Sequence, residues 1–192
     1  MSLSEPALST DLPEPPESRI RKLIRYSQRE FPWYRFVPGR HPHPVRDPLG
    51  HSYQGKGKVH HQESWHLTGW RTVEDWCYGV DLFNQFYFWE AHEAWEGLWA
   101  VADRDGAPRL LLQGLIQVAA ACLKAHLGVW KGTRSLSEEG LGKLRRAGDL
   151  QPHLLGLDIP VTVAEFDSYF ARIASQPVLL LAPDLPILRL RD

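Results

Sequence analysis

One stretch of the chain, Phe86–Trp99, constrains its fold more than any other. With about 100° of rotation per residue in an α-helix, the stretch gathers two indoles, an imidazole and two carboxylates within an arc of roughly 120°. These side chains are Trp89, His92, Glu93, Glu96 and Trp99, and Glu90 lies at the edge of the arc. Ionisable groups among indoles are costly to bury unless they are paired or bind something. The stretch therefore predicts an amphipathic helix that carries a site, and it names no reaction.

The segments around this helix carry the signals of further helices. Apolar side chains recur at helical spacing, and turn or breaker residues separate the runs. Thr72, with Asp75 three residues later, has the arrangement of a capping box. Gly128 is expected to end a long apolar helix, and Thr162 is expected to cap the last one. The predicted helices are 72–84, 87–101, 109–127, 133–147 and 163–175. We therefore predict an all-α fold, a helical bundle of about five helices.

The rest of the chain divides around a helical domain that we place at 72–176. Residues 1–18 are rich in Pro, Ser and Glu and are expected to be disordered. Residues 19–71 hold too many Pro and Gly for a regular element, yet they are rich in aromatic side chains. We therefore predict an irregular N-terminal arm, basic and rich in Pro and aromatic residues, that packs on the bundle. The prolines near the end of the chain predict an extended C-terminal tail over 177–192.

The charge distribution agrees with this organisation. Residues 19–71 contain eleven Lys and Arg against three Asp and Glu, a net charge of +8. Residues 72–105 contain one against eight, a net charge of −7. Docking of a basic arm on acidic helices is the simpler interpretation. A basic patch that binds an anionic ligand is the alternative.

Composition limits the classes of protein that the chain can belong to. With 43% hydrophobic residues, 23% charged residues and a net charge of −1, it has the composition of a soluble globular protein and not that of a general nucleic-acid binder. The N-terminus lacks the basic and apolar regions of a secretory signal, and no apolar run approaches the ~18–20 residues that span a bilayer. Cys77 and Cys122 lie far apart in apolar patterns, as buried thiols in a reducing compartment do. We expect a cytoplasmic protein that neither crosses a membrane nor binds nucleic acid.

Three side chains of the motif helix are the first candidates for a site. His92 and Glu96 are four residues apart, and Glu93 lies three residues before Glu96, so all three share one face. An imidazole with two carboxylates suits a divalent metal ion such as Zn, Mn or Fe, and it also suits general acid–base catalysis. The same residues fit a closed hydrogen-bond network between helices or a plain polar stripe on the surface. The sequence leaves these interpretations open.

Further residues are candidates for the same site. Glu90 lies beside the triplet, and Gln113 and Gln117 share one side of the third predicted helix, from which their amides are expected to face the carboxylates. In the arm, prolines would stiffen a loop that delivers His43 and His51 as ligands. The alternative is that these two histidines only pack and form hydrogen bonds.

Two motifs in this region resemble a known family. The first is LFN at 82–84 followed by WEAHEAWE at 89–96, and the second is LQGLIQVAAA at 112–121. In order and spacing they resemble the family called domain of unknown function 309. The resemblance implies an all-helical bundle and names no activity. The glycine that the family has two residues after LFN is Phe86 here, so the turn before the motif helix must be built differently. The motif residues of the family carry over to Asn84, Glu90, His92, Glu93, Glu96, Gln113 and Gln117.

These observations predict a helical protein with a polar pocket that binds a small ligand or a divalent metal ion, with hydrolysis as the chemistry that such a pocket would supply. The alternative is a structural or protein-interaction module whose EAHE motif, 90–93, is only a helix-packing hydrogen-bond network. The sequence leaves open whether the protein is an enzyme and whether it forms homo-oligomers.

Overall fold

The structure, a computed structural model, describes residues 23–53, 69–175 and 185–191. Five α-helices and one short 3-10 helix dominate these residues, so the predicted all-α fold is confirmed. The only sheet in the described ranges is a two-stranded antiparallel hairpin. The predictions made for 1–18 and 177–184 lie outside the described residues. The elements are η1 Trp70–Thr72, α2 Glu74–Asn84, α3 Phe88–Val101, α4 Ala107–His126, α5 Trp130–Leu150, β1 His153–Leu154, β2 Leu157–Asp158 and α6 Ile159–Ser175.

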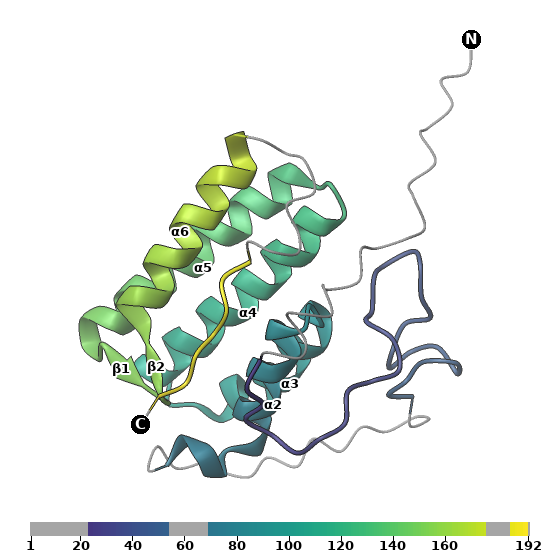
Figure 1. Cartoon of the computed structure of the whole chain (residues 1–192), viewed down its shortest axis with the longest axis horizontal. Helices are drawn as coiled ribbons and strands as arrows, with labels where there is room; N and C mark the ends of the chain where they lie inside the picture. Colours follow the sequence, from purple (N-terminus) through teal and green to yellow (C-terminus); the bar gives the residue numbers. More distant parts are fainter. Residues whose placement is uncertain (1–22, 54–68, 176–184, 192) are drawn as a thin grey trace.

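Each helix packs on the next one along the chain, α2 on α3, α3 on α4, α4 on α5 and α5 on α6. The three long helices α4, α5 and α6 lie alongside one another, and the shorter hairpin of α2 and α3 packs on α4 through α3 (Figure 1). Aromatic rings connect the first helix with the last. Phe83 of α2 lies 5.7 Å from the ring of Phe166 on α6 and 6.1 Å from that of Trp95 on α3. The helices therefore share one apolar core.

The closest helix pair, α4 and α5, approaches through two glycines. A Cβ atom on Gly114 would lie 2.7 Å from the side chain of Leu144 and 2.9 Å from the carbonyl oxygen of Gly140. No real side chain fits at those distances. Because Gly140 has no side chain, the two backbones can meet at this point. This close packing explains why α5 tolerates a residue that lowers helix stability by roughly 1 kcal/mol relative to Ala.

The two predicted N-terminal helix caps, at Thr72 and Thr162, are wrong. Val73, not Thr72, precedes α2, and no side chain caps that helix. The hydroxyl of Thr72 donates to the carbonyl of Gly69 instead, and Asp75 pairs with Arg29 of the arm, so the capping box does not form.

The last helix, α6, also begins earlier than predicted. It starts at Ile159, with Pro160 in its first turn, where a missing N–H costs nothing. Oδ1 of Asp158 accepts the N–H of Val161 at this end. Thr162 lies inside the helix and donates to the carbonyl of Asp158.

The turn between α2 and α3 has the hydrogen bonds of a Schellman motif. The N–H of Phe86 donates to the carbonyl of Phe83 (3.0 Å), and that of Tyr87 donates to the carbonyl of Leu82 (2.9 Å). Phe86 occupies the left-handed position with φ 67°, where glycine is the usual residue. The substitution noted in the sequence therefore leaves the turn type in place and puts a phenyl ring in it. That ring is 9% exposed and packs edge-on against Phe88.

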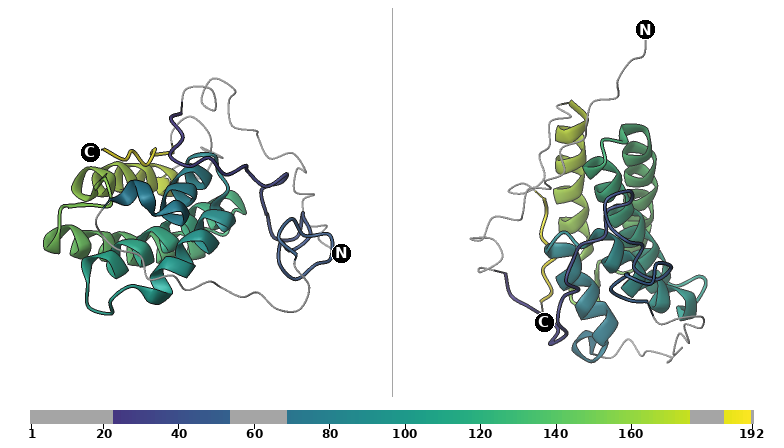
Figure 2. Two further views of the ribbon diagram at one scale, coloured as in Figure 1. Left: turned by 90° about the horizontal axis from the view of Figure 1, so that it is seen from below. Right: turned by 90° about the vertical axis from the view of Figure 1, so that its right-hand side faces the viewer.

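The described part of the arm, 23–53, runs along the outside of the helices (Figure 2). Asp81 of α2 is 2% exposed, and its carboxylate accepts the backbone N–H groups of Tyr26 and Ser27, both at 2.9 Å. Further along the arm, Phe31 stacks on Tyr78 and Tyr87. Asn84 binds the C-terminal segment, because its amide both donates to the carbonyl and accepts from the N–H of Leu188. Polar groups on α2 thus hold two distant segments of the chain.

Among the described residues, no helix is long and apolar enough to cross a bilayer. Both cysteines are free and buried. Burial is the main reason that the pKa of Cys77 rises to about 11, and it also raises the pKa of Cys122. Both thiols are therefore protonated at neutral pH and pack as small apolar side chains.

Candidate metal and ligand site on α3

The motif helix α3 uses its ionisable side chains in two different ways. Glu90, in the first turn, is only 5% exposed. Its Oε1 accepts a hydrogen bond from the backbone N–H of Phe36 (2.8 Å) and lies 3.0 Å from Nε2 of His51. Both partners belong to the arm. Glu90 therefore holds the arm against α3.

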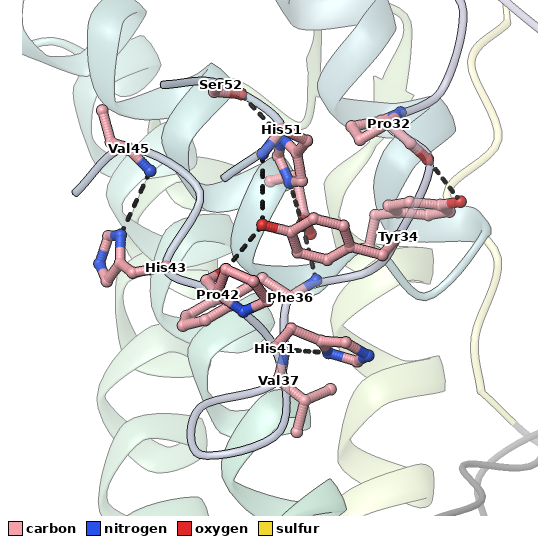
Figure 3. Close-up of polar contacts among 12 residues, drawn as sticks. Pro32, Tyr34, Phe36, Val37, His41, Pro42, His43, Val45, His51 and Ser52 are labelled. Carbon is pink, nitrogen blue, oxygen red and sulfur yellow. Dashed lines mark hydrogen bonds and ion pairs between the residues drawn. The ribbon is translucent and has the colours of Figure 1, made fainter. Parts of the chain in front are cut away.

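His51 is buried together with Glu90, with side chains 3% and 4% exposed. Its ring lies against that of Tyr34, with centroids 4.5 Å apart, and its Nδ1 lies 2.8 Å from the hydroxyl of Ser52 (Figure 3). The hydroxyl of Tyr34 donates to the carbonyl of Pro42 (2.7 Å) and accepts the N–H of His51 (3.3 Å). These contacts fix the orientation of the imidazole that meets Glu90.

The second arm candidate, His43, also makes contacts within the arm and with α3. Its Nδ1 accepts the N–H of Val45 (3.3 Å; Figure 3), and its ring lies 5.4 Å from that of Trp89 and 5.1 Å from that of Phe36. Neither His43 nor His51 joins the group formed by His92, Glu93 and Glu96.

That group is the one cluster of metal-ligating side chains in the part of the chain that the structure describes. One ligand atom from each of the three residues lies within 4.8 Å of the others. Nε2 of His92 is 3.2 Å from Oε1 of Glu96, and Nδ1 of His92 is 3.8 Å from Oε1 of Glu93. All three residues come from successive turns of α3, so helix geometry alone brings them together.

The exposure of these side chains differs from the sequence-based expectation. We expected a buried polar face, but the side chains of His92, Glu93 and Glu96 are 26%, 27% and 49% exposed. Nδ1 of His92 is shielded from solvent and has no hydrogen-bond partner among the described residues. The buried carboxylate of the motif is Glu90, which the helical arc placed at its edge. The triplet is therefore accessible to solvent, whereas Glu90 is not.

The two glutamines of α4 are both half-buried. Gln117 points away from the carboxylates of α3, because its Nε2 donates to Glu139 on α5 (2.9 Å) and its Oε1 is buried without a hydrogen bond to a described residue. The side of α4 that carries Gln117 packs on α5 near Gly140, whose Cβ would lie 3.1 Å from that of Gln117. The expected hydrogen bond from Gln117 to the α3 carboxylates is thus replaced by one to α5.

Sequence reasoning did not identify Asp81 as a functional residue of the fold. A signal was present, because Asp81 interrupts an otherwise apolar run, Val80 to Phe83, on a helix that is buried along most of its length. A buried carboxylate in such a run needs donors from elsewhere in the protein. The arm supplies them.

The fold and this site define an all-α protein with a mixed imidazole and carboxylate face on one helix of its bundle. Residues 76–136 match the model of the family described as "Domain of unknown function (DUF309)", which confirms the resemblance that the two motifs indicate. The match runs from α2 into α5 and includes the complete motif helix. No curated protein matches the chain.

Proposed function

We propose that the face formed by His92, Glu93 and Glu96 binds a divalent metal ion. The observation that carries the proposal is the 3.2 Å separation between Nε2 of His92 and Oε1 of Glu96. Two atoms that bind one ion at about 2.0–2.2 Å lie roughly this far apart. Glu93, which has a ligand atom within 4.8 Å of those of His92 and Glu96, serves as the third ligand. Nitrogen and carboxylate ligands favour Zn, Mn or Fe over Ca.

A metal ion with three protein ligands keeps coordination positions for water or a small ligand. The partial exposure of the triplet makes those positions reachable from solvent. Water on such an ion is acidified and becomes a nucleophile, so hydrolysis of a small bound molecule is the reaction class that this site would supply. The helix itself fixes the spacing of the ligands, and the arm bound to Glu90 holds the first turn of α3 in place.

The experiment is a thermal melt of the full chain, purified without an affinity tag, with and without excess Zn, Mn or Fe. A ligand that binds only the native state raises its melting temperature. We expect such a rise for the wild type and none for His92→Ala. His153→Ala is the matched control, because His153 is a 75% exposed histidine near a carboxylate outside the triplet. The proposal is wrong if none of the ions shifts the melting temperature, or if both variants respond as the wild type does.

The network around Glu90 favours a second candidate function. There the motif serves packing, because the buried carboxylate of Glu90 and the buried imidazole of His51 join α3 to the arm. If the whole motif works in this way, the protein is a structural or interaction module without a metal site. Absence of metal binding together with large stability losses at Glu93 and Glu96 would favour this candidate.

A further inference from the structure

Among the buried polar atoms that lack a hydrogen-bond partner in the described residues, two belong to basic side chains outside α3. One is Nη1 of Arg40 in the arm, and the other is Nε2 of His126 at the end of α4. Both atoms are shielded from solvent, and neither forms a hydrogen bond within the described residues. An unpaired buried polar group destabilises the fold, and more so if it is charged. Two such groups on neighbouring segments need an explanation.

Electrostatics place these groups in one neighbourhood. Burial, followed by the positive charges of Arg40 and Arg35, lowers the pKa of His126 from its ordinary value of 6.5 to about 4. The imidazole is therefore neutral at pH 7. It lies in a region where arm guanidinium groups set a positive potential.

The arm holds Arg40 in a defined position. The N–H groups of Arg40 and His41 both donate to the carbonyl of Val37, at 3.0 and 3.3 Å. Gly39 supplies the left-handed residue of this tight turn, with φ 78°, and Nδ1 of His41 accepts the N–H of Val37 in return. The guanidinium is thus presented by a fixed turn.

Three carbonyls at the C-terminus of α4 already accept hydrogen bonds, because Leu127, Gly128 and Val129 donate to Leu123, Ala125 and Lys124. No described residue accepts a hydrogen bond from Nη1 of Arg40. A guanidinium has donors only, and its planar pair of N–H groups matches a carboxylate or a phosphate. A bound oxyanion would supply the acceptor that Arg40 lacks.

We propose that Arg40 and His126 form a binding site for an oxyanion, the phosphate or carboxylate group of a small ligand, between the arm turn 37–41 and the end of α4. Arg40 provides charge and direction, and His126 donates through Nε2 as a neutral imidazole. The site does not depend on a metal ion at His92, and it uses a different part of the arm from the contact with Glu90.

The test is titration of the full chain with sodium phosphate and, separately, with sodium acetate, each against sodium chloride at equal ionic strength. Melting temperature and histidine NMR signals report binding. For the wild type we expect saturable stabilisation by at least one of the two oxyanions, with a shift of the His126 signal. The more effective anion identifies the class of ligand. Arg40→Gln and His126→Gln should each weaken that binding, Arg40→Gln by roughly tenfold or more because it removes a charged hydrogen-bond donor.

The matched control is Arg46→Gln, which removes the same charge from an exposed position in the same arm. It should bind as the wild type does. A second readout needs no ligand: because Arg40 has no described partner at Nη1, Arg40→Gln should melt at the wild-type temperature or above it. The proposal is overturned if neither anion stabilises the wild type beyond chloride, if Arg46→Gln weakens binding as much as Arg40→Gln, or if Arg40→Gln unfolds the protein.

Discussion

At the scale of single residues, the glutamates of the motif helix differ in their surroundings. Glu90 is buried and receives its hydrogen bonds from the arm, whereas Glu93 and Glu96 are partly exposed beside His92. Residues three and four apart on a helix share a face only approximately. Glu90 and Glu93, three residues apart, differ by about 60° around the helix axis, and this offset is enough to turn a carboxylate from solvent to a protein contact.

The Glu90 contact should contribute measurably to stability. In Glu90→Gln the amide keeps an acceptor for the N–H of Phe36 but loses the charge beside His51. Breaking a buried pair by removing one partner is strongly destabilising, so we expect a loss of about 1–3 kcal/mol in the free energy of unfolding. Urea unfolding measures it. Glu138→Gln, in the exposed pair with Arg134, is the control and should change stability by less than about 1 kcal/mol. Equal effects of the two changes would contradict the role given to Glu90.

The triplet of His92, Glu93 and Glu96, which we propose as a metal site, should behave in the opposite way. Groups held for binding often add nothing to stability, or reduce it, and adjacent carboxylates repel one another unless a cation intervenes. We predict that at least one of Glu93→Gln and Glu96→Gln leaves the free energy of unfolding in metal-free buffer unchanged or raises it. If each variant instead loses more than about 2 kcal/mol, the scale of a broken buried network, the packing interpretation of the whole motif takes precedence.

His126 should make stability depend on pH. In the unfolded chain it binds a proton near its ordinary pKa of 6.5, but in the folded protein only near 4. Between these values the unfolded state holds more protons, so this residue lowers stability as the pH falls from 6.5 towards 4. We expect the stability loss between pH 7 and pH 5, in buffers free of phosphate and carboxylate, to be smaller in His126→Gln than in the wild type. Parallel curves for the two proteins would show that His126 does not carry this effect.

At the scale of elements, the turn between α2 and α3 combines backbone strain at Phe86 with burial of its side chain. A non-glycine residue in the left-handed region costs roughly 1–2 kcal/mol, and the buried ring of Phe86 offsets this cost. The helix end keeps its hydrogen bonds with either residue type, because they come from the backbone.

This balance predicts an inverted order of two variants. Phe86→Gly and Phe86→Ala both lose the buried ring and should both destabilise the protein, but only the glycine is relieved of the strain. We therefore expect Phe86→Gly to be more stable than Phe86→Ala by about 1 kcal/mol, measured by urea unfolding. The usual order within a helix, with alanine the more stable, would show that the turn is not strained at this position.

The parts of the fold that could be predicted from the sequence are those that depend on local spacing. Helix positions depend on local periodicity, so the five predicted segments correspond to α2 to α6, and the grouping of His92, Glu93 and Glu96 follows from their spacing alone. Helix ends depend on contacts with segments that are distant in sequence. Asp75, for example, bonds to Arg29 of the arm instead of closing a capping box. The hydrogen-bond partners of Glu90 and Gln117 are distant in sequence, at 36 and 51 for the first and at 139 for the second. No local pattern contains those contacts.

At the scale of the whole molecule, one helix hairpin organises both ends of the described chain. Asp81 and Glu90 bind the arm through its backbone N–H groups, and Asn84 binds the C-terminal segment. Leu190 then bridges back to Leu157 of β2. The hydrogen-bond partners of these polar side chains therefore lie in segments that pack on the bundle from outside.

Removing the arm should therefore destabilise the bundle. Deletion of 1–53 leaves the buried carboxylates of Asp81 and Glu90 without their donors and uncovers the aromatic rings of Tyr78 and Tyr87. We expect a lower melting temperature and binding of a dye specific for exposed apolar surface. An unchanged melting curve without dye binding would show that the bundle does not need the arm.

The metal site is the central claim, and equilibrium dialysis with elemental analysis tests it most directly. Tag-free protein is dialysed against Zn, Mn or Fe and then against metal-free buffer, and the metal content per chain is measured. We predict one ion per chain for one of these metals in the wild type and in His153→Ala, and none in His92→Ala. A wild-type protein that retains no ion, or a His92→Ala variant that retains as much as the wild type, would contradict the account.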